Sequence, residues 1–349
     1  MPELHFVLPG DPETRSGGFL YDRKVIDALR AAGWTVTAHA LPDGFPFPSD
    51  EARAAVEQLL AKLPDQSAVV IDGLALGVLP AEVGRHAKRL RLIGLVHHPL
   101  VDETGLDGAT RRQLHASERE ALIQVVGVIT TSHHTARGLA AYGVPADHIR
   151  VAEPGVEPAP LTAGSGGDGP VLLCVASLTP RKGHAVLLEA LAHLKPHPWR
   201  LLCAGSAERD PDCAAALRQQ CEQQGLSDRV SWLGEADAAT LDALYHGADL
   251  FVLASHHEGY GMVLTEAVVR GLPVVATSAG AMPEALPEGA GVLVPPDDPS
   301  ALAATLSPLI ADSKARAALA AGARRARESL PSWRNAGAKF AAALEDLLP

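Results

Sequence analysis

The sequence predicts an α/β protein with two doubly wound parallel sheets, one in each half of the chain. Short apolar runs of strand length alternate with amphipathic stretches, which is typical of repeated strand–helix–strand units. Only 4% of the 349 residues are aromatic while 47% are hydrophobic, which favours helices packed on sheets over an all-β fold. Residues 154–170 are rich in Pro, Gly and Ser and separate the two series of units, as an interdomain linker would.

In the first half, a strand over residues 4–8 leads into a polar loop that ends in Gly17-Gly18. A helix follows, with apolar residues on one face, and it closes at Gly33. Further strands are expected to alternate with helices. The strands are expected to begin at Trp34 and to lie over the apolar or β-branched residues 68–71, 92–96, 126–131 and 149–152.

The second half repeats this scheme. Strands are expected over 170–176, 199–204, 229–234, 249–254 and 273–277, and helices over 185–194, 213–224, 238–246, 261–270 and from about 332. Asp210-Pro211-Asp212 matches a D-x-D metal motif, but it lies in a polar stretch with Pro between the acids, so we interpret it as a turn. The predicted domains are therefore 1–157 and 170–330, with a linker over 158–169 and a last helix in 331–349.

Composition excludes several classes of protein. The net charge of −11 without a basic block argues against nucleic acid as the main partner. Four cysteines without C-x-x-C spacing indicate reduced thiols in a cytoplasmic protein. We expect no signal peptide and no membrane span, since no apolar run reaches about 18 residues. A small basic cluster (Arg85, Lys88, Arg89 and Arg91) is interpreted as solvated surface, with a weak anionic-membrane contact as the alternative.

The stretch from Glu258 to Glu266 is the leading candidate for a functional site. It follows an apolar strand and passes through a glycine loop into a helix, so it lies at the carboxyl edge of a parallel sheet, where α/β proteins bind ligands. The helix N-terminus favours a phosphate, and two acids beside it suit a ligand with hydroxyl groups. The spacing alone fits equally well an interpretation without function, in which Glu258 is a loop acid and Glu266 a solvated helix residue.

Two further features have the same ambiguity. Arg181 and Lys182 precede a helix, where cations oppose the helix dipole unless an anion binds; otherwise they are surface charges. His97-His98 ends a strand at the ligand edge, and such histidines are often only loop residues. We select His97 because it directly follows the apolar run, with a register uncertainty of one residue.

The whole string from Glu258 to Glu266 resembles the E-x7-E segment of the family 4 glycosyltransferases (glycosyl transferases group 1), which are retaining enzymes of the GT-B fold. The likeness continues through residues 271–277, 280–284 and 291–296, and extends more loosely into the first half. It implies two Rossmann-like domains facing a central cleft, with the C-terminal helix crossing back onto the first domain.

Carried over residue by residue, the resemblance implies a catalytic group of His97, Glu258, Lys182 and Arg181. Lys182 would bind the donor diphosphate, and Glu258 and His97 would hold the donor sugar. Glu266 would accept from the ribose hydroxyls. The other implied donor-binding residues are Gly17, Gly18, Ser177, Gly259, Tyr260, Gly261, Met262 and Val263. Ser177 departs from the family, which usually has a basic residue there, so either Arg181 supplies the charge or diphosphate binding is weaker.

The expected function is transfer of a hexose from a UDP- or GDP-sugar to an acceptor hydroxyl, giving an α-linked product without a metal or cofactor. The expected acceptor is a saccharide, a lipid-linked molecule or a small molecule. The alternatives are a nucleotide-sugar epimerase, a phosphorylase and a non-catalytic subunit that binds nucleotide sugar. A Rossmann dehydrogenase is disfavoured because no G-x-G-x-x-G follows the first strand of either half.

Overall fold

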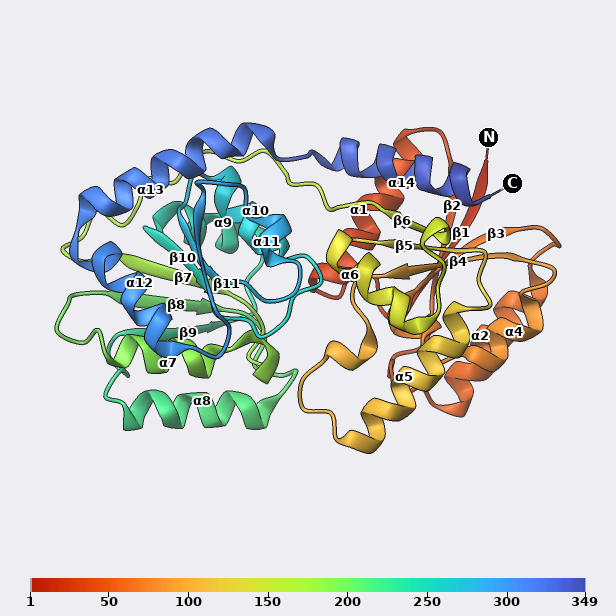
Figure 1. The fold of residues 1–349 in the computed structure, drawn as a ribbon, viewed down its shortest axis with the longest axis horizontal. Coiled ribbons are helices and arrows are strands. Elements are labelled where there is room, and N and C mark those ends of the chain that lie inside the picture. The colour runs from red at the N-terminus through yellow and green to blue at the C-terminus, as the bar shows by residue number, and fades with distance from the viewer. Residues whose placement is uncertain (1, 349) are drawn as a thin grey trace. The chain divides into compact units, whose positions relative to one another are not determined.

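The structure, a computed structural model, describes residues 2–348 and divides them into two compact units. Unit 1 contains the residues up to Gly155 and those from Pro331 onward, and unit 2 is Val156–Leu330. The chain therefore passes from one unit to the other twice (Figure 1).

Unit 1 is built on a six-stranded, fully parallel sheet with the order β2-β1-β3-β4-β5-β6. Its strands are β1 (Glu3–Leu8), β2 (Thr35–Ala40), β3 (Ala68–Asp72), β4 (Arg91–Val96), β5 (Gly127–Thr130) and β6 (Ile149–Val151). Its helices are α1 (Gly17–Ala31), α2 (Asp50–Lys62), α3 (Gly73–Leu76), α4 (Pro80–His86), α5 (Gly108–Leu122), α6 (His133–Gly138) and α14 (Trp333–Leu347). Short 3₁₀ turns are η1 (Leu100–Asp102), η2 (Leu139–Tyr142) and η3 (Ala146–His148).

The last helix, α14, packs on α1 in unit 1. Gly337 allows this approach, because a Cβ there would lie 2.3 Å from the Cβ of Ala28. Phe340 stacks on Phe6 of β1, with ring centroids 6.3 Å apart, and both side chains are fully buried. The C-terminal segment is therefore part of the unit 1 core (Figure 1).

Unit 2 is a second six-stranded parallel sheet, ordered β12-β11-β10-β7-β8-β9. Its strands are β7 (Val171–Val175), β8 (Arg200–Ala204), β9 (Val230–Gly234), β10 (Leu250–Leu253), β11 (Val274–Thr277) and β12 (Gly291–Val294). Its helices are α7 (His184–Ala192), α8 (Pro211–Gln223), α9 (Ala238–Gly247), α10 (Met262–Val269), α11 (Met282–Ala285), α12 (Pro299–Ala311) and α13 (Ser313–Ala326), with 3₁₀ turns η4 (Pro180–Lys182) and η5 (Arg327–Ser329). Figure 1 shows helices on both faces of this sheet.

The predicted fold class of two doubly wound parallel sheets is confirmed. The central strands are apolar on both faces because helices cover both sides of each sheet. Val69, Val70 and Ile71 of β3 and all four residues of β10 are completely buried.

Some local predictions need correction. Gly17 and Gly18 are the first two residues of α1, capped by the Ser16 side chain, and not the end of a loop. Asp210 is not in a turn: it caps α8 by accepting from the Cys213 N–H at 2.9 Å, and Pro211 is the first helical residue. A Ser or Asp cap followed by Pro is a common helix start, so Asp210 serves the backbone.

Other composition-based expectations can be compared with the structure directly. All four cysteines are free thiols, and three of them are buried. Arg85 pairs with Glu57, and Arg89 donates to the Leu60 and Leu63 carbonyls, so these two cations serve contacts inside unit 1. Among residues 2–348, none of the helices combines the length and the hydropathy needed to cross a bilayer.

Candidate functional site

Two loops meet at the carboxyl edge of the unit 2 sheet. Residues 176–183 follow β7, and residues 254–261 follow its neighbour β10. Because parallel strands end at the same edge, side chains 76 residues apart in the sequence come into contact there.

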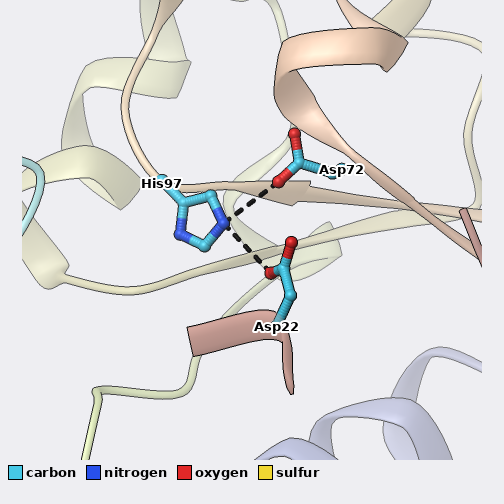
Figure 2. Close-up of side chains that lie close together, drawn as sticks. All are labelled: Asp22, Asp72 and His97. Atoms are coloured by element: carbon cyan, nitrogen blue, oxygen red, sulfur yellow. Dashed lines mark hydrogen bonds and ion pairs between the residues drawn. The ribbon is translucent and has the colours of Figure 1, made fainter. Parts of the chain in front are cut away.

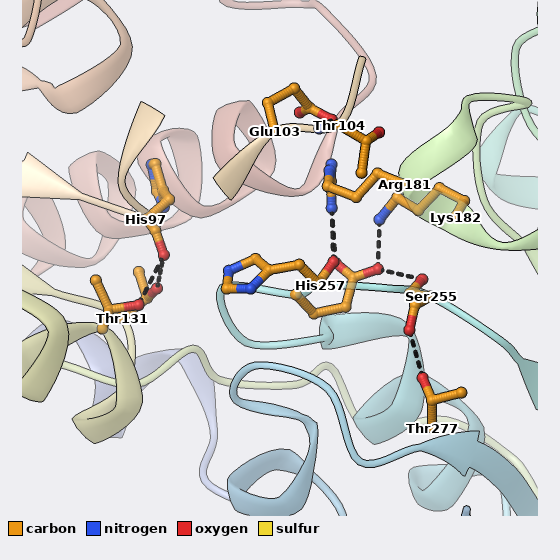
Figure 3. A network of polar contacts seen from close by, with 11 residues as sticks. His97, Glu103, Thr104, Thr131, Arg181, Lys182, Ser255, His257 and Thr277 are labelled. Atoms are coloured by element: carbon orange, nitrogen blue, oxygen red, sulfur yellow. Dashed lines mark hydrogen bonds and ion pairs between the residues drawn. The ribbon is translucent and has the colours of Figure 1, made fainter. Parts of the chain in front are cut away.

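The carboxylate of Glu258 is the centre of this site. Its Oε1 accepts from the Lys182 ammonium at 2.6 Å and from the Ser255 hydroxyl at 2.7 Å (Figure 3). Its Oε2 lies 3.4 Å from the Arg181 guanidinium, which also donates to the His257 carbonyl at 3.0 Å. The structure therefore brings together the predicted diphosphate cations and the predicted sugar-binding acid.

This cluster is buried and strongly charged. The Glu258 side chain is 9% exposed, and those of Lys182 and Arg181 are 18% and 14% exposed. Burial alone would raise the pKa of Glu258, but the charges of Lys182 and Arg181 outweigh it and lower that pKa to about 2. Glu258 is therefore ionised at neutral pH and cannot act as a general acid in this state.

Two glycines allow the loops to pack this closely. Gly183 has φ of +65°, and a Cβ there would lie 1.9 Å from the Ala254 carbonyl oxygen. Gly280, with φ of +60°, lies against the Glu258 backbone, where a Cβ would come within 2.3 Å of the carbonyl oxygen. Any other residue at either position would be strained and would displace the loop that carries Glu258.

The helices that begin at this edge differ from most others in the molecule. Most have a Ser or Asp side chain at the N-cap, whereas α7 begins after Gly183 and α10 after Gly261, both left-handed glycines without a side-chain cap. At α10, the predicted donor-binding residues Met262 and Val263 form the first turn, and Gly259 and Tyr260 are buried in the loop before it. Uncapped N–H groups and the helix dipole favour a bound anion.

Glu266 lies on α10 and is half-buried. Its Oε2 accepts from the Tyr245 hydroxyl of α9 at 3.0 Å, and the Arg270 guanidinium stacks 4.5 Å from the Tyr245 ring centroid. Burial raises the pKa of Glu266, against the lowering effects of Tyr245 and Arg270. Tyr245 thus fixes one carboxylate oxygen of Glu266, and Oε1 has no hydrogen bond to another residue among those that the structure describes.

Ser177 follows β7 and is half-buried. Gly205 packs directly on its backbone, since a Cβ at Gly205 would lie 2.8 Å from the Ser177 nitrogen. The carbonyl of Ser177 accepts from the Thr179 N–H at 2.9 Å, so a tight turn starts here. The position lies two residues beyond β7, in the loop that carries Arg181 and Lys182.

In unit 1, the structure brings the predicted His97 and Gly18 together. A Cβ on Gly18 would lie 3.4 Å from the Cδ2 of the His97 ring, so the glycine at the start of α1 packs against the imidazole. Gly17, one residue earlier, is exposed. The His97 carbonyl accepts from the Thr131 and Thr135 hydroxyls at 3.3 and 3.2 Å.

Sequence reasoning missed four residues whose side chains bond to predicted side chains. Asp22 and Asp72 both bond to His97, Ser255 bonds to Glu258, and Tyr245 bonds to Glu266. A usable signal existed for Asp72 and Ser255, because each lies at the end of an apolar strand at the same sheet edge as the residue it contacts. Asp22 and Tyr245 lie within helices, where nothing in the sequence distinguishes them from other polar or aromatic helix residues.

These features define a class of protein with two Rossmann-like units and a cluster of buried charges at a strand edge of the second. Residues 162–326 match the family described as Glycosyl transferases group 1. It is 36% identical over 214 residues to the D-inositol 3-phosphate glycosyltransferase of Xylanimonas cellulosilytica, covering 56% of this chain and 51% of the relative. It is 31% identical over 276 residues to the enzyme of that name from Acidothermus cellulolyticus, covering 70% and 60%. The matches thus span about half the length of such relatives.

Solved structures share the fold across the whole chain. Sucrose-phosphate synthase from Thermosynechococcus elongatus superposes with a TM-score of 0.83 at 23% identity, covering 99% of both chains. Anabaena Alr3699/HepE, solved in complex with UDP and glucose, gives 0.79 at 22% identity, covering 99% of this chain and 100% of that one. At these identities the likeness shows the fold, which is GT-B.

Proposed function

We propose that this protein is a retaining glycosyltransferase that moves a hexose from a UDP- or GDP-sugar to an acceptor hydroxyl. The family of residues 162–326 supports transfer from a nucleotide sugar, and a relative of the same fold is solved with UDP and glucose. In this proposal the acceptor is a saccharide, a lipid-linked molecule or a small molecule, and the reaction takes place in the cytoplasm.

The observation that carries the proposal is the cluster around Glu258. Two cations and one carboxylate share a buried strand edge beside an uncapped helix start. The net charge of the cluster is positive, so a diphosphate gains from it electrostatically. A diphosphate that binds Lys182 and Arg181 would replace part of their hydrogen bonding to Glu258. The Glu258 carboxylate can then accept hydrogen bonds from sugar hydroxyls.

The chemistry assigned to these residues is stabilisation of a leaving group. The bond between the anomeric carbon and the diphosphate oxygen breaks, and the acceptor oxygen bonds to that carbon from the same face. The acceptor's proton passes to the departing phosphate oxygen. Lys182, Arg181 and the start of α10 stabilise the negative charge that grows on the diphosphate, so no protein nucleophile and no metal are required in this scheme.

Glu266 is assigned to the ribose. Tyr245 occupies one of its oxygens, which leaves Oε1 to accept from a ribose hydroxyl. The Tyr245 hydroxyl also fixes the carboxylate rotamer, so less side-chain freedom is lost when the nucleotide binds.

A transferase-like subunit that binds nucleotide sugar without turnover is a second candidate, and Ser177 is the residue that favours it. The family usually places a basic residue there, and its absence lowers the positive charge available to the leaving group. Epimerase and phosphorylase activities are distinguished from transfer by their products.

The experiment is a thermal-shift screen of UDP- and GDP-sugars followed by product analysis. A donor at 100 times its Kd stabilises the protein by about 2.7 kcal/mol, which is readily detected. With the best donor and a panel of acceptors, the expected product is an α-linked glycoside by its anomeric proton signal. A β-linked product would contradict retention, and release of sugar phosphate that depends on inorganic phosphate would identify a phosphorylase.

A further inference from the structure

Two buried aspartates of unit 1 bind the same nitrogen of His97. Asp22, on α1, places Oδ1 at 3.2 Å from the His97 Nε2, and Asp72, at the end of β3, places Oδ2 at 3.1 Å (Figure 2). The side chains of Asp22 and Asp72 are 1% and 4% exposed, whereas that of His97 is 19% exposed. The aspartates are therefore inside the unit, and the histidine ring is only partly exposed.

The geometry favours a positive charge on the ring. Two carboxylates this close repel each other when both are ionised, and burial adds to that cost unless a cation lies between them. The Asp72 Oδ1 accepts from the Leu74 N–H at 2.7 Å, but the Asp22 Oδ2 is buried without a hydrogen-bond partner in the described structure. A protonated His97 is the cation that lies within reach of both.

The pKa values agree with this geometry. Burial alone would lower the pKa of His97, but hydrogen bonds and charges from Asp22 and Asp72 raise it to about 10. Burial and the charge of Asp72 raise the pKa of Asp22 to about 7, against the lowering effect of His97. Around pH 8 His97 is then an imidazolium and Asp22 is ionised.

The rest of the ring's surroundings hold it in one orientation. From α1, the Tyr21 ring meets the imidazole edge-on at 5.4 Å, and its hydroxyl donates to the Ala152 carbonyl at 2.7 Å. Tyr21 stays neutral, because burial and the nearby charges of Asp22 and Glu153 raise its pKa. Gly18 covers the ring. Thr131, directly after β5, and Thr135, on α6, donate their hydroxyls to the His97 carbonyl. Figure 2 shows Nδ1 pointing away from both carboxylates.

We propose that Asp22 and Asp72 are positioning residues that hold His97 as a fixed imidazolium whose Nδ1–H donates to an acceptor oxygen of the sugar donor. This rests on the proposed function, because the resemblance to the family 4 glycosyltransferases assigns His97 to the donor sugar. An imidazolium has two N–H donors and no acceptor, so His97 does not take the proton of the acceptor hydroxyl. The oxygen it binds is either a sugar hydroxyl oxygen or a phosphate oxygen.

The test is ¹⁵N NMR of the histidine rings in the intact protein, recorded in EDTA. The sequence has 15 histidines, so the His97 signals are assigned by their loss in His97→Gln. In the wild type both ring nitrogens are expected to stay protonated up to about pH 9. In Asp22→Asn and Asp72→Asn, which keep the side-chain shape, the midpoint is expected to fall by at least about one pH unit towards 6.5.

Glu153→Gln is the matched control, because Glu153 pairs with Lys339 in the same unit and does not contact His97. It should leave the His97 titration unchanged. A wild-type midpoint near 6.5 overturns the proposal. So does an unchanged midpoint in both Asn variants, with folding checked by circular dichroism.

Ligand additions then identify the oxygen. A shift of the Nδ1 signal with UDP alone indicates a phosphate oxygen, a shift with UDP-glucose but not UDP indicates a sugar oxygen, and no shift with a donor that binds overturns the donor contact. If no nucleotide sugar binds at all, the proposed function fails, while the titration still decides the charge of His97.

A pH profile gives an independent readout. As pH falls through about 7, Asp22 takes up a proton and its electrostatic attraction to His97 weakens. The wild-type kcat/KM should therefore decrease below about pH 7. Asp22→Asn should be about 10-fold less active at pH 8 and should lack that acid limb. The same acid limb in the variant would overturn the assignment to Asp22.

Discussion

The contact between Lys182 and Glu258 gives a quantitative prediction. Breaking a buried ion pair from one side leaves an uncompensated charge, which costs about 3–5 kcal/mol. The pKa of Glu258 supports a similar figure. A fall from 4.5 to about 2 corresponds to about 3 kcal/mol of stabilisation, which is present above pH 4.5 and lost as pH falls through about 2.

We therefore expect Glu258→Gln and Lys182→Met each to lower the free energy of unfolding of unit 2 by about 3 kcal/mol at pH 7. The double variant should lose much less than the sum of the two, with a coupling of about 2 kcal/mol, because each single variant leaves one member of the Lys182–Glu258 pair buried without the other. The difference between wild type and Glu258→Gln should shrink as pH falls from 4.5 towards 2.

The assay is urea unfolding followed by the fluorescence of Trp199 and Trp232, which both lie in unit 2. A background in which Trp34 and Trp333 are replaced by Phe removes the signal of unit 1. Glu189→Gln, an exposed carboxylate change on α7, is the control and should stay within about 0.5 kcal/mol of the background. Strictly additive losses in the double variant would show that this contact does not contribute the stabilisation calculated from it.

The remaining predictions concern the donor site. EDTA should leave turnover largely intact, because side chains and a helix end neutralise the diphosphate; activity lost in EDTA and restored by Mn²⁺ or Mg²⁺ would refute this. Glu266→Gln should weaken nucleotide binding about 10- to 100-fold, from a charge-assisted bond of about 1.5–3 kcal/mol. Tyr245→Phe should weaken it several-fold, and wild-type binding in both variants would remove the ribose role. Lys182→Ala should lower kcat/KM about 10²–10³-fold, and Ser177→Arg should partly restore it. If there is no recovery, Ser177 does not point towards the diphosphate.

The pattern of hydrophobic residues was sufficient to predict the fold. Buried parallel strands form continuous apolar runs, and the helices that pack on a sheet have one apolar face, so both are recognisable in the sequence. The errors of this prediction lie at helix starts. Gly17-Gly18 suggested a loop, but Ser16 caps the helix that they begin. Asp210-Pro211-Asp212 suggested a turn, but the same residue types form a capped helix start. Short polar stretches with Gly or Pro suit turns and helix caps equally, and the helix that follows decides between them.

The site was predictable where its residues lie at strand ends. His97, Lys182 and Glu258 all follow apolar strands closely, and parallel strands direct such residues to one edge of their sheet. The contact between Lys182 and Glu258 was not predicted, since it depends on how closely Gly183 and Gly280 let the loops approach. Separate ligand-binding roles were predicted for Lys182 and Glu258, whereas in the structure these two side chains bind each other.

Each unit contains a buried cluster of three charged groups, and the signs of the charges are opposite in the two clusters. In unit 1 two aspartates surround one imidazolium, and in unit 2 two cations surround one carboxylate. Such clusters contribute little net stability compared with apolar packing, because both charges lose hydration. They do fix the central group in one rotamer and one charge state before a ligand arrives. A fixed donor at His97 and a fixed acceptor at Glu258 suit recognition of hydroxyl and phosphate oxygens better than they suit proton transfer, because neither pKa lies near neutrality.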